Sequence, residues 1–370
     1  MKRLICSLVA VFMVLCAGWA YAAEPIKLGV AGAHSGELRS YGLPSLEAAK
    51  LVVSDINARG GILGRKVVIV EGDDACKPEV AANVASKLAT DGVVAVLGHI
   101  CSGATKTGLG IYRDANIITM SPSATNTDLT LSGAYPNFFR TIGSDDYQAK
   151  IITDFALKKL KLKTFAVIHD KADYGKDVAE SAKKYLESKG ARVVLFEGIT
   201  PGAVDYSAIV QKIKRSNAQM VIYGGYHPEA AKIVMGMRNK KMKTLFISDD
   251  GVKDDTFIKV AGRYAEGVYA TGPADTSKNR MAIAASEQHK KVYGSDPGAF
   301  YLNAYAAALC LLQAIDKAGS TDYAAVSKAL RSNWFDTPLG KISFDKNGDA
   351  KGIDFTVYQV QKGKYVELGK

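Results

Sequence analysis

The stretch that decides the fold of this chain is VVAVLGHICSG, residues 93–103. Its apolar run from Val93 to Leu97 has the length and β-branched content of a buried strand, and glycine, histidine and hydroxyl-bearing residues follow at once. An amphipathic segment, residues 79–91, comes just before it. A fully apolar strand preceded by a helix is typical of a parallel sheet with helices on both faces. The stretch therefore predicts an α/β fold.

The same alternation continues in both directions from this stretch. Strands are predicted at 26–30 and 67–71, and a helix at 45–58 ends where the glycines Gly60 and Gly61 close it. A second series begins near residue 145. It is predicted to contain helices at 147–160, 176–189, 206–216 and 228–237, and strands at 164–168, 192–196, 220–223, 244–247 and 267–271. Repeated βα units of this kind predict two doubly wound parallel-sheet lobes.

The length of the chain also favours two lobes, because single cores stop growing near ~250–300 residues and the chain has 370. We predict a signal peptide at 1–22, a first lobe at 23–142 and 272–350, and a second lobe at 143–271 and 351–370. Helices at 280–293, 300–317 and 323–331 are expected to return to the first lobe, and antiparallel strands are expected in the tail. The boundaries lack a Pro/Ser-rich tether, so several ordered crossings are expected to form a multi-strand hinge.

The N-terminal segment has the layout of a secretory signal peptide, with the basic pair Lys2 and Arg3, an apolar run from Leu4 to Trp19, and small residues around Ala22. The apolar run is shorter than the roughly 20 residues that a membrane-spanning helix needs. We expect cleavage after Ala22 and export to the periplasm.

The net charge of +11 raises the question of a nucleic-acid partner. The lysines are dispersed and lack interleaved aromatic residues. This pattern favours a solvated basic surface, so no nucleic-acid partner is expected. We expect a monomer.

Patterns for catalysis and metal binding are weak. The five histidines are far apart and show neither the i, i+4 pairing nor the cysteine spacing of a zinc site. Residues 29–36 follow the first strand but lack the Gly-x-Gly-x-x-Gly order of a dinucleotide loop. No catalytic residue, metal or cofactor is therefore expected. A Rossmann-like enzyme acting on a small amino acid or a carboxylic acid stays the alternative class.

Open α/β sheets bind ligands beyond the carboxyl ends of their strands, so the residues that follow each strand are the informative ones. Ser102 follows one predicted strand of the first lobe, and residues 121–126 follow the next, with Thr125 among them. Hydroxyls and free backbone N–H groups at such turns suit a carboxylate. Ser102 and Thr125 are the candidate anion-binding residues. The alternative is that each only caps a helix.

The second predicted lobe also places polar and aromatic residues just beyond its strands. Tyr174 and Tyr226 are candidates for the walls of a binding site, and Asp250 follows the strand at 244–247. An ammonium group needs an acceptor-only partner, which the carboxylate of Asp250 provides. The alternative is that Asp250 starts a turn or caps the next helix.

Several motifs along the whole mature sequence support a resemblance to a known family. They are DINARGGI at 55–62, DDAC at 73–76, GHICS at 98–102, HDK at 169–171, YGGYHPE at 223–229, and FD and GD at 344–349. The chain resembles the periplasmic leucine/isoleucine/valine-binding proteins of branched-chain amino-acid ABC transporters. The resemblance implies the type I periplasmic binding protein fold. It also implies capture of a branched-chain or other small aliphatic amino acid by cleft closure, and delivery to the membrane permease of an ABC transporter.

The resemblance also assigns site residues. It implies that Ser102, Thr125 and the backbone around Ser123 and Ala124 bind the ligand carboxylate and amine, with Asp250 as the ammonium partner. The side-chain pocket would be lined by Tyr41, Ile100, Cys101, Tyr174, Tyr226 and Phe300. A disulfide between Cys76 and Cys101 is implied as well.

Two of these positions depart from the family pattern. Asp250 stands where better-known members carry glutamate, which shortens the reach of the carboxylate by one methylene. Ser123 replaces a commoner alanine and adds a hydroxyl beside the amine site. These departures put the ligand's identity in question.

Overall fold

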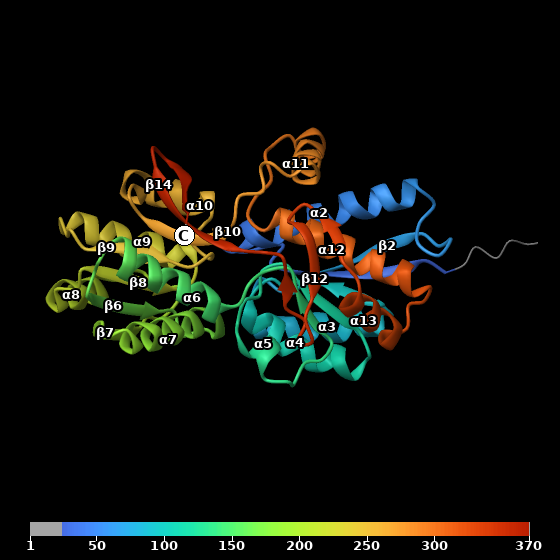
Figure 1. Ribbon diagram of the computed structural model, residues 1–370, viewed down its shortest axis with the longest axis horizontal. Coiled ribbons are helices and arrows are strands. Elements are labelled where there is room, and N and C mark those ends of the chain that lie inside the picture. Colours follow the sequence, from blue (N-terminus) through green and yellow to red (C-terminus); the bar gives the residue numbers. More distant parts are fainter. Residues whose placement is uncertain (1–23, 370) are drawn as a thin grey trace, which may run out of the picture.

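The computed structural model of the protein describes residues 24–369. Two lobes lie side by side along the long axis of the molecule, and strands with flanking helices make up both (Figure 1). The predicted α/β fold with parallel sheets is confirmed. The predicted signal peptide and its cleavage site lie outside the described residues.

The first lobe contains a five-stranded parallel sheet in the order β2-β1-β3-β4-β5. Its strands are β1 (Ile26–Gly32), β2 (Val67–Asp73), β3 (Ala95–Leu97), β4 (Ile118–Ser121) and β5 (Phe138–Arg140). Successive side chains of a strand point to opposite faces. Ala95 and Leu97 therefore enter one core, whereas Val96 enters the core on the other face. All three are buried, which explains the unbroken apolar run in the sequence.

Helices cover both faces of this sheet. Residues of α2 (Arg39–Ala58), α12 (Tyr301–Ala318) and α13 (Tyr323–Ser332) form the core on one face. The other face is covered by α3 (Pro78–Thr90) and α4 (Ser102–Asp114). The short α5 (Asp128–Leu131) precedes β5, and α11 (Arg280–Tyr293) packs against α2 and α12. A small antiparallel sheet of β11 (Phe335–Thr337), β12 (Gly340–Phe344) and β13 (Ala350–Lys351) completes the lobe.

The second lobe contains a seven-stranded sheet in the order β15-β14-β10-β9-β8-β6-β7. Its strands are β6 (Thr164–His169), β7 (Arg192–Gly198), β8 (Met220–Gly224), β9 (Leu245–Ser248), β10 (Tyr269–Pro273), β14 (Phe355–Gln361) and β15 (Lys364–Gly369). The tail strands β14 and β15 form an antiparallel hairpin that joins the parallel part beside β10. The chain's last strands thus complete the sheet of the second lobe.

Helices again pack on both faces of the second sheet. One face carries α6 (Asp145–Asp154), the π-helical turn η1 (Phe155–Lys159) and α7 (Asp173–Ser188). The other face carries α8 (Ser207–Ser216), α9 (His227–Asn239), α10 (Asp255–Ala261) and the short η2 (Gly262–Ala265).

The start of α2 differs from the sequence-based expectation. We expected the helix to begin at Ser45. It begins at Arg39 instead, with Pro44 inside it. Pro44 cannot donate a backbone hydrogen bond, so contacts with the rest of the protein must hold the preceding turn. Tyr41, in that turn, is fully buried against the second lobe.

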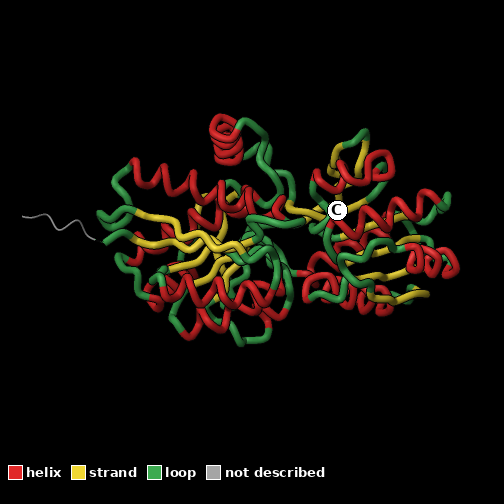
Figure 2. The backbone as a smooth tube through the Cα atoms, turned by 180° about the vertical axis from the view of Figure 1, so that it is seen from behind, coloured by secondary structure: helices red, strands yellow, loops and turns green. Residues whose placement is uncertain are grey.

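Three segments cross between the lobes, seen as loops in Figure 2. They are residues 141–144, 274–279 and 352–354. Strand β10 extends to Pro273, so the second crossing begins two residues later than the expected boundary. We propose that these three crossings act together as the hinge.

The disulfide between Cys76 and Cys101 is present, with the two Cα atoms 5.5 Å apart, as the resemblance implied. It ties the loop after β2 to the residue before α4. Cys310 is a buried free thiol in α12.

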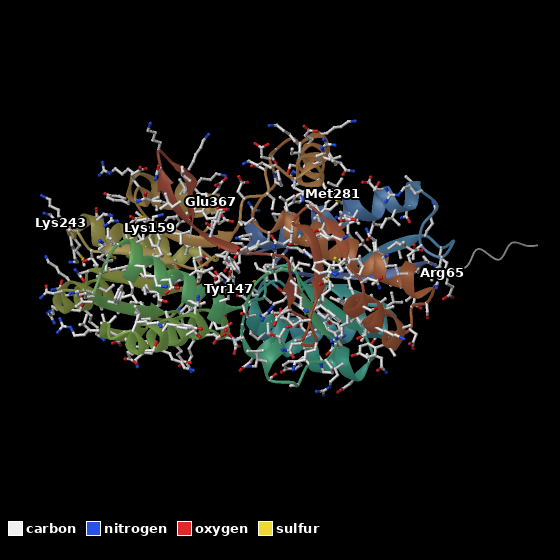
Figure 3. The ribbon with its side chains drawn as sticks, viewed as in Figure 1. Arg65, Tyr147, Lys159, Lys243, Met281 and Glu367 are labelled. Carbon is white, nitrogen blue, oxygen red and sulfur yellow. A yellow bond between two sulfur atoms is a disulfide. The ribbon has the colours of Figure 1, made fainter. Side chains whose placement is uncertain are left out.

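Basic side chains are spread over both lobes. Arg65 lies at the outer end of the first lobe and Lys243 at the outer end of the second (Figure 3). Most of the ion pairs between described side chains are exposed and lie within one helix or one lobe, such as Lys183 with Glu187 at 3.0 Å. Exposed pairs of this kind contribute little to stability.

Candidate functional site

The site lies where the carboxyl ends of both sheets face each other. The loop after β3 leads to Ser102 at the start of α4, and the loop after β4 contains Ser123 and Thr125. In the second lobe, the loop after β8 ends at Tyr226, and the loop after β9 begins with Asp249 and Asp250. Parallel strands place all these loops at the same edge of their sheet.

One cavity between the lobes is lined by eight of the residues that the sequence analysis named, together with Gly251. In this conformation the cavity has a volume of only about 10 Å³, and it is lined by Tyr41, Ile100, Cys101, Ser123, Tyr174, Tyr226, Asp250, Gly251 and Phe300. Both lobes contribute, because Tyr41 comes from α2 while Tyr174 comes from α7. The cavity is thus formed only when the lobes lie against each other.

Aromatic rings form much of the wall. The ring centroid of Tyr226 lies 5.1 Å from that of Tyr174 and 6.0 Å from that of Tyr41. The Phe300 ring lies 5.7 Å from the Tyr41 ring. Rings at these separations and tilts pack favourably, so the wall is a continuous apolar surface with hydroxyls at its edges.

Hydrogen bonds join the lobes around the cavity. The Tyr41 hydroxyl donates to the carbonyl of Gly251 at 2.6 Å and lies 2.6 Å from Nδ1 of His227. The Asn126 amide donates to the carbonyl of Asp173 at 2.9 Å, and the N–H of Thr127 donates to Asp177 at 2.7 Å. The described conformation is therefore a closed one.

Ser102, Ala124 and Thr125 lie behind the cavity wall rather than on it. Ser102 Oγ accepts a hydrogen bond from the N–H of Asn126 at 3.2 Å, which joins the two first-lobe loops. The N–H of Ala124 donates to Ser121 Oγ at 2.9 Å. The Thr125 hydroxyl is buried and makes no well-formed hydrogen bond with the described residues. Neither hydroxyl caps a helix, because the caps are Cys101 and Thr127.

Asp250 is held firmly at the second-lobe side of the cavity. Its Oδ1 accepts a hydrogen bond from the Tyr174 hydroxyl at 2.5 Å, and its N–H donates to Gln148 at 3.1 Å. Its Oδ2 is buried and has no partner among the described residues. Burial raises the pKa of Asp250 to about 6, although the Tyr174 hydrogen bond acts in the other direction. The site therefore contains a positioned carboxylate oxygen that lacks a donor.

Asp145 is a buried acid beside the first-lobe loops that the sequence reasoning did not select. Its N–H donates to the carbonyl of Thr125 at 2.9 Å, and neither side-chain oxygen has a well-formed hydrogen bond with the described residues. Burial, followed by the nearby charge of Asp177, raises its pKa well above the ordinary value. Asp145 comes soon after β5, so the strand-end rule that selected the other residues would also have selected it.

Asp249 adds a third buried carboxyl to this region. Its Oδ2 accepts a hydrogen bond from the N–H of Gly225 at 3.1 Å. Burial, and then the neighbouring charge of Asp250, raises its pKa well above the ordinary value. Several buried acids without a cationic partner make a region that favours a positively charged group.

Two glycines of β1 pack against neighbouring side chains. A Cβ atom on Gly32 would lie 2.3 Å from Cγ1 of Ile100, and one on Gly29 would lie 3.0 Å from Val96. These glycines allow close packing of β1 against its neighbours. Among residues 24–369, His, Cys, Asp and Glu side chains form no group suited to a metal ion. In the same part of the chain, no helix is long and apolar enough to cross a membrane.

The model of the family described as "Periplasmic binding protein" matches residues 25–364. The chain belongs to that family. This binding protein is similar to the leucine-, isoleucine-, valine-, threonine- and alanine-binding protein of Pseudomonas aeruginosa, with 38% identity over 94% of this chain and 92% of that one. It is also 38% identical to the Leu/Ile/Val-binding protein of Escherichia coli K12, over 91% of each chain.

Solved structures agree with this assignment. The branched-chain amino acid transporter substrate binding protein of Streptococcus pneumoniae, in complex with isoleucine, is 27% identical over 93% of this chain and 99% of that one, with a TM-score of 0.84. A leucine binding protein of Thermotoga maritima shares the fold, with a TM-score of 0.86 and 24% identity over 92% of this chain and 97% of that one. The expected type I periplasmic binding protein fold is confirmed. The protein is a solute-binding protein and not an enzyme, so the Rossmann-like enzyme alternative is wrong.

Proposed function

We propose that this binding protein captures a small aliphatic amino acid, such as leucine, isoleucine or valine, between its lobes and delivers it to the permease of an ABC transporter. One observation carries the proposal. The interlobe cavity combines an apolar aromatic wall with a buried carboxylate oxygen of Asp250 that lacks a donor. An α-ammonium group would supply that donor, and an aliphatic side chain would pack against the apolar wall once the cleft has opened to admit it.

The ligand carboxylate is assigned to the first lobe. Ser102 at the start of α4 and the buried Thr125 hydroxyl lie on the loops behind Ser123. Backbone N–H groups at the start of a helix favour an anion, because they are unpaired and carry the positive end of the helix dipole. The carboxylate would then lie on the first lobe, and the ammonium group would face Asp250 on the second.

The buried acids explain why a ligand would favour closure. Closing the lobes removes Asp250 and Asp145 from water, which penalises their charged forms. A ligand ammonium between these carboxyls offsets the penalty, so the closed form is favoured when the ligand is bound. A permease could then distinguish the loaded protein from the empty one by its shape. We place this cycle in the periplasm, with the protein acting as a monomer.

Relatives support the proposal. The Pseudomonas aeruginosa and Escherichia coli relatives are named for the same group of aliphatic amino acids, and the Streptococcus pneumoniae structure holds isoleucine. One methylene in an apolar pocket is worth only about 1–3 kcal/mol. We therefore expect several aliphatic amino acids to bind with affinities within about two orders of magnitude of one another.

Calorimetric titration of the ligand-stripped protein with leucine, isoleucine, valine, threonine and alanine tests the proposal. We expect binding of one ligand per chain without turnover. The amide of leucine, which lacks the carboxylate, and a desamino analogue of leucine, which lacks the ammonium, are matched controls and should bind far more weakly. Absence of heat with all five amino acids would overturn the assignment of the ligand.

A further inference from the structure

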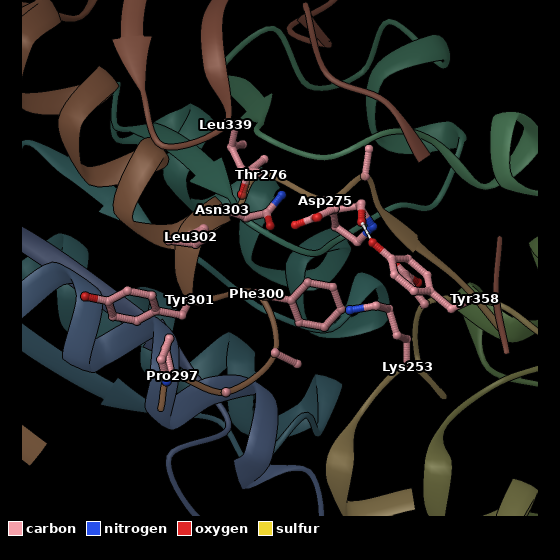
Figure 4. Close-up of a pocket in the computed structure, with 15 residues that line it drawn as sticks. Lys253, Asp275, Thr276, Pro297, Phe300, Tyr301, Leu302, Asn303, Leu339 and Tyr358 are labelled. Carbon is pink, nitrogen blue, oxygen red and sulfur yellow. Dashed lines mark hydrogen bonds between the residues drawn. The ribbon is translucent and has the colours of Figure 1, made fainter. Parts of the chain in front are cut away.

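A second cavity lies directly behind the proposed ligand site. It has a volume of about 220 Å³, and Asp250 and Phe300 line both cavities. Figure 4 shows the side chains of Lys253, Asp275 and Asn303 converging on this space, beside the Phe300 ring. We call this space the outer cavity, lined by Lys253, Pro273, Ala274, Asp275, Thr276, Pro297, Tyr358 and neighbouring residues. Only the Asp250–Phe300 wall separates it from the inner one.

Lys253 is the unusual residue of the outer cavity. Its Nζ lies over the Tyr358 ring, 4.4 Å from the centroid. No carboxylate of the described residues lies within ion-pair distance of it, and burial lowers the pKa of its ammonium group. The carboxylates of Asp254, Asp255, Asp275 and Glu367 act on the ammonium group from further away. The group therefore has donors that no described side chain engages in an ion pair.

The structure holds this lysine in place. A Cβ atom on Gly272 would lie 2.2 Å from Cδ of Lys253, so the lysine stem runs directly over the glycine in β10. The N–H of Lys253 donates to the carbonyl of Asp250 at 3.1 Å. One tight turn thus presents the Asp250 carboxylate to the inner cavity and the Lys253 ammonium to the outer one.

Asp275 lines the same cavity and its charge acts on Lys253, but its oxygens bond to Ser277 and form no ion pair with the lysine. Its Oδ1 accepts from the N–H of Ser277 at 2.8 Å, and its Oδ2 accepts from the Ser277 hydroxyl at 2.7 Å. These hydrogen bonds lower the pKa of Asp275. The outer cavity therefore offers one held cation whose hydrogen-bonding capacity is unused.

Phe300 lines both cavities and its ring packs against Tyr41. Its backbone has φ of 60°, in the left-handed region that phenylalanine rarely adopts, at the residue before α12. The loop that carries it rests on α2, where a Cβ atom on Gly298 would lie 2.7 Å from Cγ of Pro44.

We propose that the outer cavity is a second subsite of the ligand cleft, in which Lys253 binds the distal carboxylate or carbonyl oxygen of a longer amino acid whose ammonium group lies at Asp250. This inference rests on the proposed function, because it uses the same ammonium position. It extends the ligand class from aliphatic amino acids to amino acids whose unbranched side chain ends in an anionic or carbonyl group.

Two ligands of equal chain length separate the subsite from the inner pocket. Norleucine ends in a methyl group where α-aminoadipate ends in a carboxylate. We expect the wild-type protein to bind both ligands. Lys253→Met should weaken the binding of α-aminoadipate by about tenfold or more, and it should change the affinities for norleucine and leucine by less than twofold. Lys253→Arg should retain most of the α-aminoadipate affinity. Lys240→Met, at an exposed lysine after α9, is the matched control.

The outcomes distinguish this inference from the proposed function. Leucine binding by the wild-type protein without measurable α-aminoadipate binding would overturn the subsite and leave the proposed function standing. An equal loss of affinity for all three ligands in Lys253→Met would also overturn the subsite, because the lysine would then only support the turn at Asp250. Failure of leucine and norleucine to bind the wild-type protein would refute the proposed function, and this inference with it.

Discussion

Asp250 shows how single residues set the chemistry of this cleft. One oxygen accepts a hydrogen bond from the Tyr174 hydroxyl, and the other has no well-formed hydrogen bond with the described residues, although the Gln148 side chain lies close enough to lower the pKa of the carboxyl. Buried polar atoms are nearly always paired, so an orphaned oxygen that lies in a cavity indicates a ligand. The aspartate is shorter than a glutamate, and Tyr174 compensates by fixing its direction.

We expect Asp250→Asn to weaken leucine binding at least about 100-fold at neutral pH, because removing one partner of a buried charge pair costs about 3–5 kcal/mol. The substitution keeps the size of the side chain, so the fold should persist. Calorimetric titration measures the affinity. Asp255→Asn, at an exposed carboxylate in α10, is the control. An affinity for Asp250→Asn within threefold of wild type would exclude Asp250 as the ammonium partner.

The first turn of α2 shows how an element delivers a residue to the site. Tyr41 reaches Gly251 only because the helix starts before Pro44. Gly42 makes this possible, since a Cβ atom there would lie 1.9 Å from the carbonyl oxygen of Ala33. The helix turn therefore packs directly on the loop after β1.

Gly42→Ala should displace this turn and the Tyr41 ring with it. We expect a loss of about 1–3 kcal/mol in the free energy of unfolding, as for other overpacked sites, together with weaker leucine binding. Denaturant unfolding and calorimetric titration measure the two effects. Gly110→Ala in α4 is the matched control, because no atom lies within 4 Å of the added Cβ, and it should leave stability unchanged or raise it slightly. Equal effects of the two substitutions would contradict the role of Gly42.

Closure of the whole molecule depends on the buried acids. In the closed form, burial raises the pKa of Asp250 to about 6, whereas in an open, hydrated cleft its pKa should be close to the ordinary value of about 3.9. The closed form thus binds more protons than the open form between these two values. Lowering the pH through 6 therefore favours closure of the empty protein, and the raised pKa values of Asp145 and Asp249 act in the same direction.

Small-angle scattering can measure this coupling. We expect the empty protein to be open at pH 8 and to become more compact on addition of leucine. We also expect the empty protein to become more compact as the pH falls below 6, and the empty Asp250→Asn variant to be more compact than wild type at pH 8. A radius of gyration that responds to neither leucine nor pH would rule out closure driven by these acids.

Much of the fold and of the site could be read from the sequence, because both follow from local rules. Apolar runs of five or six residues between amphipathic segments specify buried parallel strands, and the residues after such strands must gather at one edge. Tyr174, Tyr226 and Asp250 were selected for this reason, and all three line the cavity. Tyr41, Phe300 and the disulfide came from the family resemblance alone.

Other features were decided only by the tertiary structure. The turn before Pro44 is helical because it packs on a neighbouring loop, which local propensity does not reveal. The unused donors of Lys253 and the raised pKa of Asp145 arise from groups far apart in sequence that close around each other. Burial and electrostatic environment depend on which surfaces of the two lobes meet. The sequence by itself therefore determined the strands, the lobes and the edge where the cavity lies, and the packing of the lobes decided which charged groups there stay unpaired.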